Sequence, residues 1–261
     1  MNNDKRYAVL IDADNISDKY VKIILDEISN DGIATYKRIY GDWTRPTFAS
    51  WKSVLLEHSI TPIQQYGYTY GKNATDSAMI IDAMDILYSG NVEGFCLVTS
   101  DSDFTRLASR LRESGMDVVG MGESKTPKAF IAACNKFKYL DLLAQKAEQP
   151  AEAPAAAVTV EQEEEVMTNL DTIKKAITTI AQENTDEDEW IFIGDIGNKL
   201  QKRYPDFDVR NFGFSKFTPF IKSLDLFEIK SERINGSNNK LIYVREKPEP
   251  QKPEPQSKNK K

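Results

Sequence analysis

The sequence has few of the residues that form disulfides, soft-metal sites or histidine-based active sites. Its 261 residues include two cysteines, Cys96 and Cys134, and one histidine, His58. Cys96 falls in an apolar strand pattern and Cys134 in a helical pattern, which favours buried thiols over a disulfide or a metal site. A single histidine excludes a ribonuclease mechanism that uses two histidines as acid and base. We interpret His58 as structural or exposed.

Long hydrophobic runs are also missing, as is an excess of positive charge. No segment approaches the length of a membrane span, and the amino-terminal residues contain no long apolar stretch. We therefore expect a cytoplasmic protein that does not bind membranes. The formal net charge is -6, so the chain as a whole has no basic field that would indicate nucleic acid. Local basic patches can still bind nucleic acid.

What is present is a repeated combination of a buried strand followed by carboxylates. Residues 8–11, AVLI, run directly into Asp12, and residues 95–98, FCLV, are followed closely by Asp101 and Asp103. Such uninterrupted apolar runs are typical of parallel strands that are buried on both faces. Ligands of open parallel sheets bind beyond the carboxyl ends of the strands. If the two strands are neighbours, these acids share one pocket.

Helical and strand patterns alternate through the first half of the chain. Apolar residues recur at helical spacing over residues 17–31, 48–58, 76–88 and 104–114, and in a segment that begins at Pro127 with Thr126 as its cap. Strand patterns lie at residues 8–11, 35–40, 60–64, 95–98 and 117–121. This alternation predicts an α/β fold, with a parallel sheet flanked by helices.

The second half has a different organisation. Residues 145–167 are rich in Ala, Pro, Gln and Glu, which is a linker composition. Three helical patterns follow at residues 170–181, 193–204 and 212–224, and we expect Pro219 to kink the third. Two strand patterns, at residues 227–230 and 241–245, flank a turn at residues 235–238. These elements predict a small winged-helix (α+β) module over residues 168–246, and the repetitive residues 247–261 predict a disordered tail. Residues 1–144 then form the first domain.

The chemistry of the acidic residues indicates a hard divalent cation. Asp12, Asp101 and Asp103 leave strand ends, and Asp76 begins a helix after a loop that returns to the same edge. Carboxylates without converging His or Cys suit Mg²⁺ or Mn²⁺, and packed carboxylates repel one another unless a cation neutralises them. One or two such ions can polarise a phosphodiester and activate water. Three other aspartates are assigned to helix caps or turns: Asp14, Asp18 and Asp82.

Three separated segments together resemble a known family. LIDADN at residues 10–15, KNATDSAMIIDAMDIL at residues 72–87 and LVTSDSDFTRLASRLRESGMDVVGMG at residues 97–122 resemble the NYN domain, a PIN-like nuclease fold. The resemblance covers roughly the first half of the chain. It implies a metal-dependent ribonuclease that hydrolyses RNA phosphodiester bonds with Mg²⁺ or Mn²⁺.

The resemblance also assigns roles to individual residues. Asp12, Asp76 and Asp101 match the acidic site of the family, and Asn15 and Asp103 match its supporting polar positions. We expect Asp12 and Asp101 to be the principal metal ligands, and Asp76 to be a further ligand or to orient the water. Asp103 would support these ligands without coordinating the metal ion itself. Ser100 and Asn15 could hydrogen-bond the ligands or a phosphate.

Basic residues near the predicted pocket are candidates for contacts with RNA phosphates. Arg45 and Lys72 lie in aromatic loops that follow the second and third strands, and Lys125 and Lys128 lie at the start of a helix. The aromatic residues of these loops either stack on unpaired bases or pack the loops themselves. The predicted substrate is therefore RNA, single-stranded by preference.

The segment EWIFIGDIGNKLQKRYPDFDVRNFGFSKFTPFIKSLDLFEI at residues 189–229 resembles the OST-HTH or LOTUS domain, a winged-helix fold. The resemblance implies RNA binding, with protein docking as the alternative. Candidate RNA contacts are Lys202, Arg203, Arg210 and Lys216. Such charges often belong simply to a solvated face.

Two other functions fit part of the sequence. Asp12 and Asp14 resemble the Asp-x-Asp of haloacid-dehalogenase-type phosphatases, in which the first Asp is phosphorylated. However, Asn15 stands where those enzymes usually have Thr or Val. The other alternative is an RNA-binding adaptor whose nuclease fold has lost turnover. The oligomeric state stays open, with a weak association through the winged-helix domain as one option.

Overall fold

The computed structural model describes residues 4–66, 74–148, 167–184, 190–233 and 240–247. Contacts divide the chain into two compact units, and we describe each unit by itself. The first unit comprises Met1–Asn169 and Gln201–Gly213, and the second comprises Leu170–Leu200 and Phe214–Lys261. No helix among the described residues is both long enough and apolar enough to cross a membrane.

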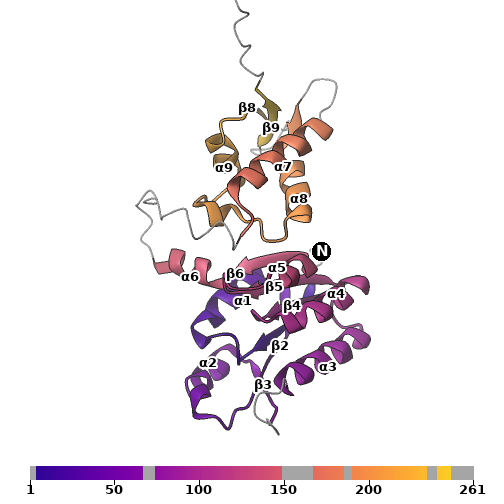
Figure 1. The fold of residues 1–261 in the computed structure, drawn as a ribbon, viewed down its shortest axis with the longest axis vertical. Coiled ribbons are helices and arrows are strands. Elements are labelled where there is room, and N and C mark those ends of the chain that lie inside the picture. The colour runs from indigo at the N-terminus through magenta and orange to yellow at the C-terminus, as the bar shows by residue number, and fades with distance from the viewer. Residues whose placement is uncertain (1–3, 67–73, 149–166, 185–189, 234–239, 248–261) are drawn as a thin grey trace, which may run out of the picture. The chain divides into compact units, whose positions relative to one another are not determined.

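The first unit is built on a six-stranded parallel sheet with the strand order β3-β2-β1-β4-β5-β6 (Figure 1). The strands are β1 (Arg6–Asp12), β2 (Ile33–Gly41), β3 (Thr61–Gln64), β4 (Gly94–Val98), β5 (Asp117–Gly122) and β6 (Lys136–Tyr139). β1 lies centrally, and its residues from Ala8 to Ile11 are fully buried. β1 and β4 are direct neighbours, with Ile11 paired to Val98. The predicted parallel sheet is confirmed, and the carboxyl ends of the two acid-bearing strands lie side by side.

Helices cover both faces of this sheet, as the lower part of Figure 1 shows. They are α1 (Val21–Ser29), α2 (Trp51–His58), α3 (Ala74–Ser89), α4 (Thr105–Glu113), α5 (Lys128–Ala133) and α6 (Leu140–Glu148), with short 3-10 turns η1 (Asp18–Tyr20), η2 (Pro46–Phe48) and η3 (Ser102–Phe104). Helices α3, α4 and α5 pack on one face with Ala8 and Leu10 of β1. Helices α1, α2 and α6 pack on the other face with Val9 and Ile11. The strict alternation along β1 thus supplies both halves of the core.

Two features of this unit differ from the sequence prediction. Pro127 is the N-cap of α5 rather than its first residue, and the Thr126 hydroxyl donates to the carbonyl of Glu123 at 2.5 Å instead of capping the helix. Strand β6 and helix α6 have no predicted counterpart. β6 alternates buried Phe137 and Tyr139 with lysines, a pattern too short to be distinguished from a loop by its sequence alone.

The second half of the chain forms a small helical domain with a three-stranded antiparallel sheet of order β7-β9-β8. The elements of this half are α7 (Leu170–Glu183), β7 (Ile191–Phe192), α8 (Ile193–Arg203), η4 (Val209–Phe212), α9 (Phe217–Ser223), β8 (Phe227–Arg233) and β9 (Lys240–Glu246). Contacts group the last residues of α8 and all of η4 with the first unit. The turn predicted at residues 235–238 lies outside the described residues, as do residues 149–166 of the predicted linker and residues 248–261 of the predicted tail.

The single helix predicted over residues 212–224 is wrong. The chain forms η4, which ends at Gly213 with a φ of 82°, and only then begins α9 at Phe217. A positive φ favours glycine, which explains the break at this position. Pro219 consequently lies in the first turn of α9, where no intrahelical N–H bond is required, and the expected kink does not arise.

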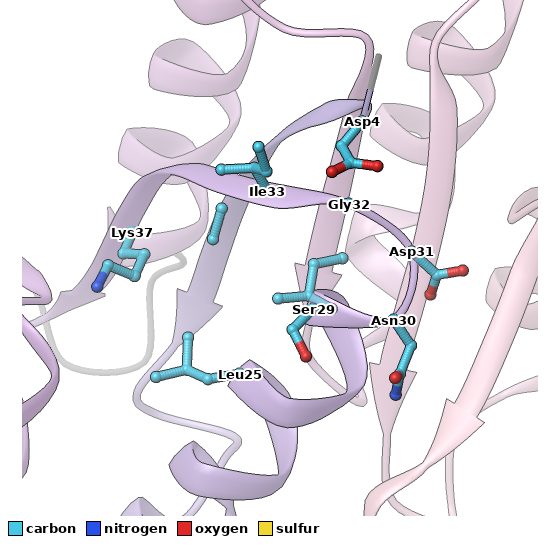
Figure 2. A pocket seen from close by; sticks show the side chains of 10 residues that line it. Asp4, Leu25, Ser29, Asn30, Asp31, Gly32, Ile33 and Lys37 are labelled. Carbon is cyan, nitrogen blue, oxygen red and sulfur yellow. The ribbon is translucent and has the colours of Figure 1, made fainter. Parts of the chain in front are cut away.

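A cavity of about 530 Å³ opens beside the end of α1 and the start of β2. Figure 2 shows that side chains such as Leu25, Asp31, Ile33 and Lys37 surround it. The start of β2 lies at the amino ends of the parallel strands, whereas the predicted acidic residues lie at the carboxyl ends. The cavity is therefore separate from the candidate site residues Asp12, Asp76, Asp101 and Asp103.

Candidate active site

Neighbouring elements bring the acidic residues to one edge of the sheet. Asp12 is the last residue of β1, and Asp101 and Asp103 follow β4, where Asp101 caps the 3-10 turn η3. Asp76 lies in the first turn of α3, the helix that packs against β1 and β2. Because β1 and β4 are adjacent and parallel, their ends deliver these side chains to the same place.

Three of the carboxylates converge closely. Asp76, Asp101 and Asp103 each offer a carboxylate oxygen, and these three atoms lie within 4.8 Å of one another. Asp101 is fixed from within the turn, because its Oδ1 accepts a hydrogen bond from the backbone N–H of Asp103 at 2.9 Å. All the potential metal ligands are carboxylate oxygens, which hard cations prefer as ligands. The cluster could therefore hold a metal ion.

Asp12 is placed differently from the other three. Its side chain is fully buried, and it does not belong to the group of three converging carboxylates found among the described residues. Its Oδ2 accepts hydrogen bonds from Asn15 Nδ2 at 2.7 Å and from Thr99 Oγ1 at 2.9 Å, and its Oδ1 accepts from the N–H of Asp14 at 3.1 Å. Burial raises the pKa of Asp12 above its ordinary value, while these hydrogen bonds oppose the rise. Asp12 is thus a rigidly held buried carboxylate.

The electrostatics of the site centre on Asp76. Burial is the largest cause that raises the pKa of Asp76 to about 6, followed by the negative charges of Asp12, Asp101 and Asp103. The charge of Asp12 therefore acts on Asp76 although Asp12 does not belong to the three converging carboxylates. Their repulsion disfavours full ionisation without a cation, and a bound cation would remove this penalty.

These positions coincide with a known domain family. A model of the NYN domain matches residues 6–141, over half of the chain. The chain belongs to the NYN domain family. NYN domains are PIN-like nuclease domains, and the parallel sheet and acidic cluster described above lie within the matched residues. A model of the OST-HTH/LOTUS domain matches residues 168–238, so this NYN domain is followed by a second recognised domain.

Comparisons with individual proteins add little to the family assignment. No curated protein matches the chain. A crystal structure of a protein of unknown function from Vibrio parahaemolyticus is similar with 16% identity and a TM-score of 0.46, over 53% of this chain and 94% of that one. A solution structure of an uncharacterized protein from Nitrosomonas europaea has 31% identity and a TM-score of 0.26, over 39% of this chain and 88% of that one.

Thr99 is a residue of the NYN site that the sequence analysis did not single out. It is fully buried, and its hydroxyl donates to Asp12 Oδ2 and accepts the backbone N–H of Asp101 at 3.1 Å. One hydroxyl thus connects the carboxylate at the end of β1 to the backbone that carries Asp101. In the sequence, Thr99 could have been found from its position between the apolar run at residues 95–98 and the acidic turn that begins at Asp101.

Asp82 also differs from the sequence prediction. It was assigned to a cap or turn, but it lies in the middle of α3 and accepts hydrogen bonds from the Tyr40 hydroxyl and the Arg38 guanidinium of β2. Tyr40 is fully buried and is the register partner of Asp12. This cluster fastens the helix that carries Asp76 to the strand beside Asp12.

The predicted basic contacts of the NYN domain lie in different surroundings. Arg45 lies 3.4 Å from Asp14 Oδ1, beside the acidic residues. Lys125 pairs with Glu123 at 2.7 Å, and the exposed Lys128 begins α5. Lys72 lies outside the described residues.

In the second half of the chain, Lys202, Arg203 and Lys216 are exposed. Arg210 belongs to the first unit, where its guanidinium donates to Glu27 Oε1 at 2.6 Å and to Asp208 Oδ2 at 2.6 Å. These bonds raise its pKa, with the hydrogen bond to Glu27 as the largest cause. A guanidinium held in this way has fewer donors left for a phosphate than an exposed one.

Proposed function

We propose that this chain is a metal-dependent endoribonuclease whose OST-HTH domain binds RNA. The observation that carries the proposal is the convergence of Asp76, Asp101 and Asp103 within 4.8 Å at the carboxyl edge of an NYN-domain sheet. Asp101 and Asp103 come from the turn after β4 and Asp76 comes from α3, so their meeting is a property of the tertiary structure. Clusters of this composition suit Mg²⁺ or Mn²⁺.

In this proposal Asp76, Asp101 and Asp103 hold the cation, and Asp12 adds a fourth negative charge beside them. The ion, when bound, supplies Lewis-acid polarisation of the phosphodiester and lowers the pKa of water. Thr99 and Asn15 keep Asp12 in one orientation through their hydrogen bonds. Asp76 must be ionised to act as a ligand, which makes ion binding dependent on pH around its pKa of about 6.

The surroundings of the site favour a polyanionic substrate over a small phosphomonoester. Arg45 lies 3.4 Å from Asp14 Oδ1 with its side chain 54% exposed, and in this proposal it meets a phosphate of a longer chain. A haloacid-dehalogenase-like phosphatase would need Asp12 as a nucleophile open to substrate. The Asp12 side chain is fully buried and both of its oxygens accept hydrogen bonds, which argues against that role.

The test is cleavage of a labelled circular single-stranded RNA in Mg²⁺, in Mn²⁺ and in EDTA, with the matching single-stranded DNA in parallel. A circle has no ends, so its linearisation reports endonucleolytic cleavage alone. We expect metal-dependent cleavage of the RNA by the wild type, and loss of cleavage in Asp76→Asn and Asp101→Asn. Asp85→Asn is the matched control, because Asp85 is an exposed carboxylate on the same helix as Asp76.

Three outcomes would contradict this proposal. Cleavage that survives in both site variants would indicate a contaminating nuclease. Equal cleavage of RNA and DNA would overturn the assignment of RNA as the substrate. Tight binding of RNA without cleavage in either metal would instead support the inactive RNA-binding adaptor.

A further inference from the structure

The outer face of the three-stranded sheet in the second unit carries aromatic side chains. Strand pairing places Phe192 of β7 opposite Tyr243 of β9, and Tyr243 opposite Lys230 of β8. These three side chains therefore form one row across all three strands. The rings of Phe192 and Tyr243 are 5.9 Å apart and meet edge to face.

The opposite face of the same sheet is the buried one. Ile191, Phe227 and Val244 are at most 5% exposed, and each is adjacent in sequence to a residue of the outer face. Because side chains alternate along a strand, the aromatic row points away from this core. Tyr243 and Phe192 are only half-buried.

Trp190, which precedes β7, adds a third ring to this face. The guanidinium of Arg245 lies 5.0 Å from the centre of its ring, and the ammonium of Lys230 lies 5.7 Å from it. Arg245 and Tyr243 are two residues apart on β9 and share its outer face. The outer face thus combines three aromatic rings with two cations, and we refer to Trp190, Phe192, Tyr243, Lys230 and Arg245 as the aromatic face.

The charges of the aromatic face are balanced. Lys230 pairs with Glu232 at 2.7 Å, and Arg245 pairs with its cross-strand partner Glu228 at 2.6 Å. A surface that bound nucleic acid mainly through its phosphates would need an excess of positive charge. Because both cations are paired with carboxylates, the aromatic rings are a better basis for binding nucleic acid at this surface than its charge.

We propose that the aromatic face binds unpaired RNA by stacking bases on Trp190 and Tyr243. Planar rings that are partly open to solvent and flanked by cations are the surface on which single-stranded nucleic acids stack. The proposal rests on the proposed function, since it takes RNA as the ligand of the chain. It places the contact on the sheet rather than on the exposed lysines and arginine of the neighbouring helices.

Phe192 has a supporting role in this proposal. A Cβ on Gly194 would lie 2.4 Å from its ring, so the ring occupies space that only glycine leaves open. Phe192 packs closely against Gly194 and meets the Tyr243 ring edge to face. We assign base stacking to the other two rings.

The test measures binding of the full chain to a short, unstructured, fluorescent RNA by anisotropy, in EDTA so that cleavage cannot occur. We expect Trp190→Leu and Tyr243→Leu each to weaken binding about tenfold, in line with the known effect of removing one stacked aromatic ring. Trp190→Phe and Tyr243→Phe keep a ring and should stay close to wild type. Tyr88→Leu is the matched control, because Tyr88 is 73% exposed on α3 of the NYN domain.

Further readouts separate stacking from a loss of folding and from phosphate binding. RNA should quench the fluorescence of Trp190, so the quenching should be weaker in Trp190→Phe although that variant still binds. The leucine variants should retain the wild-type far-UV circular dichroism spectrum and the wild-type dependence of Kd on salt, because the affected contact is not ionic.

The proposal is overturned if both leucine variants bind RNA within about twofold of wild type, since stacking would then contribute too little. It is also overturned if the leucine variants lose binding only together with their fold. Cleavage of RNA is measured separately, with Asp101→Asn as the variant that tests it. Failure of the aromatic face therefore leaves the nuclease proposal intact, and loss of the nuclease proposal leaves a positive anisotropy result valid.

Discussion

Removing the charge of Asp76 should stabilise the metal-free NYN domain while it abolishes metal binding. In the folded chain, burial and the neighbouring carboxylates raise the pKa of Asp76 to about 6, well above the ordinary value of 3.8. Between these two pH values the folded state binds more protons than the unfolded state, so the free energy of unfolding falls as the pH rises through this window. Below pH 4 the penalty is absent, and above pH 6 it is fully present.

The size of the effect follows from the two pKa values. Their difference corresponds to about 3 kcal/mol at 1.36 kcal/mol for each factor of ten. Asp76 is only partly buried, so solvent screening reduces this to about 1 kcal/mol. Asp76→Asn should therefore raise the Tm of the first unit by about 2–4 °C at about pH 7.5 in EDTA. The gain should vanish near pH 4, where the wild-type side chain is itself protonated.

Calorimetric scans of the wild type and Asp76→Asn, in EDTA and in millimolar Mg²⁺ or Mn²⁺, measure both the stability without metal and the stabilisation by metal. The wild-type Tm should rise when metal is added, because an ion that binds only the folded state stabilises it. Asp76→Asn should show little rise, and the exposed control Asp85→Asn should follow the wild type in both conditions. An unchanged or lower Tm for Asp76→Asn in EDTA would refute the argument from charge repulsion. An undiminished response to metal in that variant would remove Asp76 from the proposed ligands.

Three further predictions concern the same site. Thr99→Val should lower the cleavage rate at least tenfold and lower the free energy of unfolding by about 1–3 kcal/mol, because the buried Asp12 carboxylate loses a hydrogen bond. Thr99→Ser keeps the hydroxyl and should restore both the rate, measured by cleavage, and the stability, measured by urea titration. Tyr40→Phe should cost about 1–2 kcal/mol in urea unfolding, because it removes a buried hydrogen bond to the Asp82 carboxylate, and it should also weaken the rise of Tm with metal. The cleavage rate at subsaturating metal should increase with pH through about 6 as Asp76 ionises, and a flat profile from pH 5 to 7 would contradict that assignment.

Local sequence patterns were enough to predict the main architecture of the NYN domain. The apolar runs at Ala8 to Ile11 and Phe95 to Val98 are short and uninterrupted, which is typical of parallel strands buried on both faces, and both runs form such strands. If both strands are parallel in one sheet, the residues that follow them lie at the same edge, beyond the carboxyl ends of the strands. The placement of Asp12, Asp101 and Asp103 at one edge of the sheet therefore followed from local patterns and one topological rule. The two buried cysteines followed in the same way from their apolar surroundings.

Features that depend on which segments meet could not be derived from these patterns. The apolar spacing over residues 212–224 continues past Gly213, so it predicted one helix, although glycine at this position permits the left-handed turn that ends η4. Strand β6 is too short for its alternation to be diagnostic. In both places the local signal was weaker than the long-range packing that overrode it.

The same limit applies within the candidate site. The sequence grouped Asp12 with the other carboxylates, and the folded structure shows how their surroundings differ: three converge, whereas Asp12 is buried and held by Asn15 and Thr99. The contact of Asp82 with Tyr40 joins residues 42 positions apart. The aromatic row of Phe192, Tyr243 and Lys230 exists only through strand register. Periodicity along a chain determines which face a side chain occupies, whereas its partner on that face is decided by pairing between distant segments, which only the folded structure specifies.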